Sequence, residues 1–275
     1  MKIAAASLAA SALLLVATPV AAQDTAPPKP VTVTGSVALV SDYRFRGVSQ
    51  SDEEMALQGG ITVAHRSGFY GGAWASNLAG WGTFGGANLE LDLFGGYKRT
   101  LGGGGGGTID VGLTWYMYPG GASNTDFAEP YAKLSGTIGP ASLLAGVAYA
   151  PKQRALGNFS ATPSSRGQSK DNLYLWGDAA VGVPTTPLTA KAHIGYSEGN
   201  PGLGPNGTSV APTGRYWDWM LGADYVLGPV TLGVAYVDTD IGRAESAYLL
   251  PNFASTKDRG PIADAQLVLS VSAAF

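Results

Sequence analysis

The segment ADAQLVLSVSAAF, residues 263–275, alternates between apolar or small and polar side chains. Leu267, Leu269, Val271 and Phe275 fall on one parity, whereas Gln266 and the serines of the segment fall on the other. A period of two is the pattern of a β-strand with one apolar face. The segment therefore predicts a strand that runs to an aromatic residue.

The same alternation predicts eleven further strands. In residues 87–100, for example, Leu89, Leu91 and Leu93 oppose Asn88, Glu90 and Asp92. The predicted strands are Val31–Phe45, Ala56–Arg66, Phe69–Leu78, Ala87–Thr100, Thr108–Tyr118, Phe127–Ile138, Ala141–Ala150, Asn172–Val183, Leu188–Ser197, Tyr216–Leu227, Val230–Thr239 and Pro261–Phe275.

The connecting segments alternate in length. Tight turns are predicted at 66–68, 102–107, 139–140, 184–187 and 228–229, and longer loops at 47–55, 79–86, 119–126, 151–171, 198–215 and 240–260. Short turns at one end and long loops at the other are typical of an outer-membrane barrel, whose turns face the periplasm. An even number of strands places both ends of the barrel segment on the turn side.

Aromatic residues concentrate near the strand ends, as two membrane interfaces would require. Those near the loops include Tyr43, Phe45, Trp115, Tyr118, Tyr149, Tyr174, Trp176, Tyr196, Trp217, Trp219 and Tyr236, and those near the turns are Tyr97, Tyr225 and Phe275. Every backbone polar group in a bilayer must be paired within the protein, so the sheet must close on itself. The sequence therefore predicts an all-β fold, a transmembrane antiparallel up-and-down β-barrel of about twelve strands over residues 31–275.

Composition agrees with an exported membrane protein. Residues 1–22 combine Lys2, an Ala/Leu-rich stretch and a small-residue site, as in a cleaved signal peptide, and a Pro-rich lead follows at 23–30. Charged residues make up 13%, about half the share of about 25% in soluble domains, and cysteine is absent. The net charge of -3 gives no reason to expect a nucleic-acid partner. These features predict localisation in the cell outer membrane of a Gram-negative bacterium.

The segment Ser41–Gln50, SDYRFRGVSQ, resembles the opening motif of the TorF family of putative porins. Further segments that resemble this family are 58–60, 67–77, 90–97, 116–119, 129–131 and 216–219. The resemblance implies an outer-membrane pore of undefined substrate and supplies no catalytic residues. It also implies that the barrel-assembly machinery recognises the strand that ends at Phe275, which makes this residue a candidate assembly signal.

The inward parity predicts a lumen with nine acids and six bases. The acids are Asp42, Glu90, Asp92, Asp110, Glu129, Asp178, Asp218, Asp224 and Asp264, and the bases are Arg44, Arg46, Arg66, Lys98, Lys133 and Lys191. Twelve strands lie between eight, whose interior side chains fill, and sixteen, which leave an aqueous channel. Two interpretations stay open: a charged constriction that selects solutes, or ion pairs that only satisfy a polar interior.

The remaining candidate chemistry is sparse. His65 shares parity with Ile61 and Val63, and could face lipid as the histidine of a barrel phospholipase does, but no serine neighbour is evident. His193 is expected in the lumen, and two scattered histidines do not make a metal site. The acidic run 52–54 could hold a divalent cation or simply be a solvated loop. The sequence predicts no enzyme, no cofactor and no metal.

The expected function is a porin-like channel for passive diffusion of small hydrophilic solutes, with a weak preference for cations. The alternative is a closed barrel whose extracellular loops bind a ligand or partner at the cell surface. The expected partners are outer-membrane lipid and lipopolysaccharide, the barrel-assembly machinery and the solutes themselves.

Overall fold

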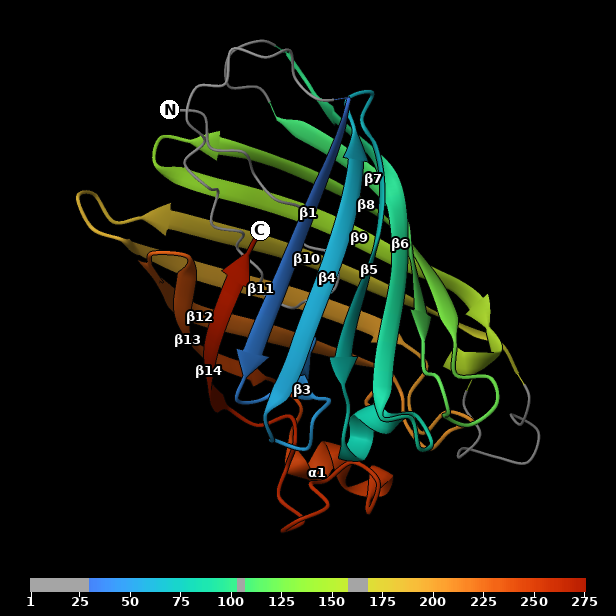
Figure 1. The fold of residues 1–275 in the computed structure, drawn as a ribbon. Coiled ribbons are helices and arrows are strands. Elements are labelled where there is room, and N and C mark those ends of the chain that lie inside the picture. The colour runs from blue at the N-terminus through green and yellow to red at the C-terminus, as the bar shows by residue number, and fades with distance from the viewer. Residues whose placement is uncertain (1–29, 103–106, 158–167) are drawn as a thin grey trace.

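A computed structural model describes residues 30–102, 107–157 and 168–275. Twelve antiparallel strands form a closed barrel in the order β1-β14-β13-β12-β11-β10-β9-β8-β7-β6-β5-β4 (Figure 1). They are β1 (Val31–Val40), β4 (Ala56–His65), β5 (Phe69–Asn77), β6 (Leu89–Thr100), β7 (Thr108–Met117), β8 (Phe127–Ile138), β9 (Ala141–Gln153), β10 (Lys170–Gly182), β11 (Leu188–Gly199), β12 (Arg215–Leu227), β13 (Val230–Thr239) and β14 (Gln266–Ala274). The predicted fold class is confirmed. The signal peptide and the Pro-rich lead predicted at 1–22 and 23–30 lie outside the described residues, apart from Pro30.

The barrel closes where the last strand meets the first. β14 pairs with β1 from Val40↔Ser270 to Ser36↔Ala274. Beyond this register, the Gly35 N–H donates to the Phe275 carbonyl at 2.7 Å, and the Phe275 N–H donates to the Gly35 carbonyl at 2.9 Å. A Cβ atom at Gly35 would lie 2.5 Å from the Phe275 ring. A side chain at position 35 would clash with the Phe275 ring, so glycine is needed for the ring to pack against the first strand.

The two faces of the barrel differ as the alternation predicts. Leu57, Leu93 and Leu221 are exposed on the outside, whereas Glu90 and Asp92 are buried on the inside. An apolar outer band against a polar interior is the arrangement that a bilayer stabilises. The described residues contain no helix long and apolar enough to cross a membrane.

Closure predicts the behaviour of the folded protein on a gel. Since each barrel strand is hydrogen-bonded on both sides, we expect the unboiled protein to stay folded in SDS and to migrate differently after boiling. Circular dichroism in detergent should show β structure almost alone. A helical spectrum, or identical mobility before and after boiling, would contradict the closed barrel.

The first strand is shorter than the sequence suggests. The prediction continued it to Phe45, but β1 ends at Val40, and β2 (Arg44–Phe45) pairs with β3 (Val48–Ser49) in a separate hairpin. Arg46 and Gly47 form its two-residue turn with φ of 49° and 80°, the positive values that tight hairpin turns of this kind require. The hairpin strand also alternates between apolar and polar residues, and for this reason the sequence pattern does not show where the barrel strand ends.

The predicted aromatic girdle is found only in part. Trp115, Tyr149, Trp217 and Tyr236 face outward as predicted, and all are more than 40% exposed. Other aromatics assigned to the girdle are buried inside the barrel: Tyr43, Tyr118 and Tyr174. Tyr43 packs edge-on against Trp74, with ring centroids 5.5 Å apart. Position near a strand end therefore does not by itself predict contact with lipid.

Loops cover the end of the barrel opposite the tight turns (Figure 1). They contain η1 (Gly80–Thr83), η2 (Arg154–Leu156), α1 (Arg243–Ser246) and η4 (Ala247–Leu249). Backbone bonds join segments 41–55, 78–88 and 240–265: Ala79 N to Gln50 O at 3.0 Å, and Ser49 N to Ile262 O at 2.9 Å. Buried Trp81, Leu249 and Phe253 belong to one apolar cluster, which also includes Val48 of the hairpin. The long loops thus form a packed cover at the predicted outer mouth.

Candidate functional site in the barrel lumen

The β2–β3 hairpin crosses the full width of the lumen. It follows β1, and Arg46 at its tip donates from Nη2 to both carboxylate oxygens of Glu129 at 2.7 and 2.8 Å, and from Nη1 to Asn172 Oδ1 at 2.7 Å. Glu129 lies on β8 and Asn172 on β10, on either side of β9, the strand opposite β1 in the ring. The hairpin therefore spans the lumen from β1 to the opposite wall and narrows the passage.

Aromatic rings and close packing hold the tip in this position. The Arg46 guanidinium lies 4.1 Å from the Tyr174 ring centroid and 4.8 Å from that of Phe45. A Cβ atom at Gly47 would lie 2.3 Å from Thr239 Cγ2, so only glycine fits against this wall. Burial alone would lower the pKa of Arg46, but the charge and hydrogen bonds of Glu129, together with Tyr116 and Tyr174, outweigh burial and raise that pKa above its ordinary value. The guanidinium is therefore a permanent charge inside the barrel.

The base of the hairpin is a second polar network. Asp42 accepts hydrogen bonds from Arg44 Nε at 2.6 Å, Ser49 Oγ at 2.6 Å and Ser51 Oγ at 3.2 Å. Arg44 also donates to the Asp264 carbonyl oxygen at 2.8 Å. Both mouth arginines predicted from the sequence are thus present at the constriction, and both are neutralised by a carboxylate.

The acidic run 52–54 anchors the same loop. Asp52 accepts hydrogen bonds from the backbone and the hydroxyl of Thr256, Glu53 lies 3.3 Å from Arg44, and Glu54 pairs with Lys257 at 2.8 Å. Each carboxylate therefore has its own protein partner. Asp52 is buried and braces two loops, whereas Glu54 is 59% exposed, so the solvated-loop interpretation still describes the end of the run.

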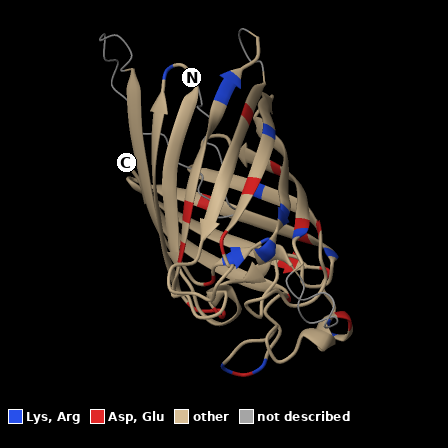
Figure 2. Ribbon diagram, turned by 90° about the vertical axis from the view of Figure 1, so that its right-hand side faces the viewer, with Lys and Arg blue, Asp and Glu red and all other residues tan. Residues whose placement is uncertain are grey.

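Several wall charges also pair with one another. Lys191 Nζ lies 2.6 Å from Asp224 Oδ1, and His193 lies between Asp178, 2.6 Å from Nδ1, and Asp218, 3.1 Å from Nε2. Asp110 is in register between Lys98 on β6 and Lys133 on β8. Figure 2 shows acidic and basic positions interspersed along the barrel strands in view. The ion-pair interpretation of the lumen thus holds for much of the wall.

Two predicted lumen acids lack a basic partner. Glu90 and Asp92 on β6 are almost fully buried, at 2% and 1% exposure. Among the ion pairs that the described part of the chain forms, none includes either residue. The acidic excess predicted from the sequence is therefore concentrated at one place on the wall.

Two charges assigned to the lumen lie elsewhere. Asp264 precedes β14, its side chain is 41% exposed, and it pairs with Arg243 at 3.3 Å in the outer loops. Arg66 is exposed in the turn after β4. Alternation fails at both positions because each lies just beyond the end of its strand, where the pleat no longer sets the direction of the side chain.

His65 has a serine neighbour that the sequence analysis missed. Ser67 Oγ lies 2.7 Å from His65 Nδ1, and both residues are exposed at the turn. The backbone N–H of Ser67 also donates to the same nitrogen at 3.2 Å. Both contacts join residues two positions apart and stabilise the turn. The ring nitrogen of His65 therefore accepts a local hydrogen bond from the backbone.

A cavity of about 100 Å³ lies beside the hairpin tip. Aromatic and charged side chains share its wall, which includes Arg46, Tyr116, Glu129, Tyr131, Lys133, Tyr174, Trp176, Asp178, His193 and Asp218. Tyr70, Tyr131 and Asp110 continue this wall through hydroxyl hydrogen bonds of 2.5 Å. The space is large enough for a few waters or one small solute, and it places a solute against charges of both signs.

Within residues 30–102, 107–157 and 168–275, no group of three or more His, Cys, Asp or Glu side chains is arranged to hold a metal ion. His193 and its two aspartates are already joined by hydrogen bonds.

Comparison with known proteins identifies a family and a shared fold. A family model described as "Bacterial protein of unknown function (Gcw_chp)" matches residues 24–275. No curated protein matches the chain. The NanC porin is similar with a TM-score of 0.53 at 10% identity, and the KdgM porin with 0.51 at 9%; each comparison covers 88% of this chain and 99% of the other. At such identities the similarity concerns the fold.

Proposed function

Because the chain belongs to the Gcw_chp family and shares its fold with porins, we propose that it is an outer-membrane channel for passive diffusion of small hydrophilic solutes. The observation that carries this function is the contrast between an apolar outer face and a lumen lined by charged side chains. Structural neighbours that are channels also argue against the enzyme class.

The finer features of the proposal follow from the sequence. The motif at 41–50 supports placement among the TorF putative porins, and residues 1–22 support export to the outer membrane. There the apolar band would contact lipid and lipopolysaccharide, and the barrel-assembly machinery would insert the chain. Residues 31–275 would form the barrel after residues 1–22 are removed.

The constriction sets the size and charge of the permitted solute. The hairpin leaves little free space, so only small solutes would pass beside it. Most lumen charges are paired, whereas Glu90 and Asp92 have no counter-charge, and this imbalance favours cations weakly. The preference should decrease at high salt, because screening shortens the range of their field.

Conductance of the purified protein in a planar bilayer tests this function. We expect discrete current steps, and in a KCl gradient a reversal potential with the sign of modest cation preference that shrinks as total salt rises. Protein inactivated by boiling is the control for detergent leaks. If folded barrels insert and carry no current, the closed-barrel alternative with ligand-binding loops replaces the channel. An anion-selective current would contradict the charge assignment alone.

A further inference from the structure

Glu90 and Asp92 are two positions apart on β6, so their side chains leave the same face of the strand, about 7 Å apart along it. Both oxygens of the Asp92 carboxylate are buried without a hydrogen-bond partner. Burying an ionised carboxylate costs several kcal/mol unless a charge or hydrogen bonds compensate it. A buried polar group with no partner in the protein indicates an ion or water that the protein binds.

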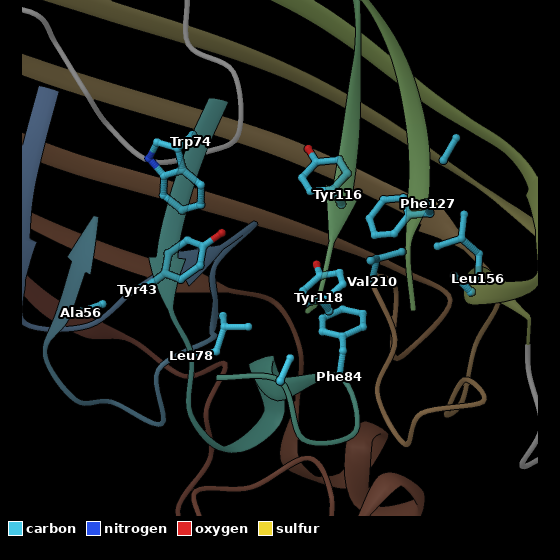
Figure 3. Packing of buried hydrophobic residues seen from close by; sticks show 13 residues of the cluster. Tyr43, Ala56, Trp74, Leu78, Phe84, Tyr116, Tyr118, Phe127, Leu156 and Val210 are labelled. Carbon is cyan, nitrogen blue, oxygen red and sulfur yellow. The ribbon is translucent and has the colours of Figure 1, made fainter. Parts of the chain in front are cut away.

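A third group from a different segment faces the same acids. Tyr43, at the base of the hairpin, is 2% exposed, and its hydroxyl forms no hydrogen bond of ordinary geometry among the described residues. Burial raises the pKa of Tyr43, and the negative charges of Glu90 and Asp92 raise it further. Tyr43 packs against Trp74 (Figure 3), and Trp74 is in register with Asp92. The Tyr43 hydroxyl therefore belongs to the same part of the wall as the two carboxylates.

Neighbouring strands add neutral oxygen atoms at the same level. Ser76 on β5 is in register with Glu90, and Gln58 on β4 is in register with Ser76. Both side chains are buried in the interior. Side chains directly opposite each other on paired strands have Cβ atoms about 5 Å apart. Two carboxylates, a phenol, a hydroxyl and an amide thus occupy one patch of the wall.

We propose that this patch, formed by Glu90, Asp92, Tyr43, Ser76 and Gln58, binds one calcium ion. When ionised, two carboxylates without bases carry two negative charges, which one divalent cation neutralises. Calcium takes six to eight oxygen ligands in irregular geometry, including bidentate carboxylates and amide or hydroxyl oxygens. Magnesium would keep several waters, for which a site at 1–2% exposure has no room. The sequence predicted no metal, because two of the five groups become neighbours only through strand pairing and one through the inward hairpin.

The ion would link the base of the hairpin to the barrel wall. Tyr43 precedes the hairpin and Glu90 and Asp92 lie on the wall, so a shared ion fastens the base of the hairpin to β6. The tip is held separately by Glu129 and Asn172. Calcium would therefore stabilise the constriction. Because it would neutralise the two acids to which the cation preference is attributed, that preference should be present in calcium-free solution and weaken when calcium binds, whereas conduction itself does not depend on the site.

Terbium luminescence tests the site on the folded barrel in detergent. Terbium occupies calcium sites and is excited by nearby indole and phenol rings, here Trp74, Tyr43 and Tyr116. Wild type should show saturable luminescence that calcium displaces with a dissociation constant on the order of 1 mM or lower, as in extracellular calcium modules. Magnesium and potassium at the same ionic strength should displace it much less.

Substitutions locate the bound ion. Glu90→Gln with Asp92→Asn removes both charges while keeping shape, and we expect at least a tenfold loss of calcium affinity. The matched control, Glu198→Gln with Glu245→Gln, makes the same charge change at exposed positions in β11 and α1 and should leave binding unchanged. Trp74→Phe should dim the luminescence while calcium still binds, measured by calorimetry.

The possible results are decisive. Equal calcium affinity in the two double variants, or no wild-type binding up to about 10 mM, well above the weakest extracellular modules, would overturn the site. In that case protonation would be what neutralises the two acids. Conductance is measured separately on the same preparations, so loss of the calcium site and failure of the channel give different results.

Discussion

Replacing Arg46 by alanine is expected to increase single-channel conductance several-fold and to shift selectivity toward cations. Arg46 supplies all three hydrogen bonds that pin the hairpin tip to Glu129 and Asn172. Removing one partner of a buried ion pair destabilises the structure by about 3–5 kcal/mol, since the other charge stays buried without compensation. The unpaired Glu129 gains stability if the tip moves away and water enters, which widens the passage and exposes a negative charge.

The partner substitution separates passage width from charge. Glu129→Gln also releases the tip, so conductance should again increase, but the uncompensated guanidinium of Arg46 should shift the reversal potential toward anions. The Arg46→Ala, Glu129→Gln double variant should conduct well with little change in selectivity. These opposite signs cannot arise from a general loosening of the barrel.

The control is Arg243→Ala, which removes the same kind of side chain from an exposed outer-loop pair with Asp264. Its conductance and reversal potential should match wild type. Heat-modifiable gel mobility confirms that each variant is folded before it is recorded. Unchanged conductance in both Arg46→Ala and Glu129→Gln would show that the hairpin does not limit the current.

Much of the barrel could be predicted from alternation because the bilayer imposes it. A strand between lipid and a polar lumen must be apolar on one face and polar on the other, so Leu89, Leu91 and Leu93 against Glu90 and Asp92 were assigned correctly. Short turns and single loops between successive strands predicted that each strand pairs with the next one along the chain, as observed. The segment 31–45 marks the limit of this reasoning, because a lumen hairpin alternates as a barrel strand does.

The site was predicted as a set of residues but not as an arrangement. Parity placed Glu129 and Asp92 in the lumen, and it also named Arg46, which enters the lumen on the hairpin rather than on a barrel strand. Parity does not predict which acid pairs with which base across the barrel. The Arg46–Glu129 pair joins residues 83 positions apart in sequence and forms only because the hairpin folds into the lumen. The positive φ at Arg46 is invisible in the sequence, where only the following glycine suggests a turn.

The second large effect concerns Phe275. We expect its deletion to reduce the membrane-inserted amount of protein severely, with the unassembled chain degraded in the periplasm. Phe275 exchanges two backbone hydrogen bonds with Gly35, and its ring lies over that glycine on the outer face. Without it, the Gly35 N–H and C=O lose their partners at the membrane boundary, where each orphaned group costs several kcal/mol.

Two point variants divide this effect between the backbone and the ring. Phe275→Ala keeps the paired backbone but removes the interfacial aromatic, whereas Phe275→Tyr keeps both and should insert as wild type does. If the ring is the feature that the assembly machinery recognises, Phe275→Ala should insert as poorly as the deletion; if pairing with Gly35 dominates, it should be intermediate. The measurement is the amount of heat-modifiable protein in outer-membrane fractions at matched expression.

Because Phe275 lies on the outer face and contributes no group to the lumen, any protein that inserts without Phe275 should conduct nearly as wild type. Equal insertion of the deletion and wild type would show that neither the ring nor this last backbone pair is needed for assembly.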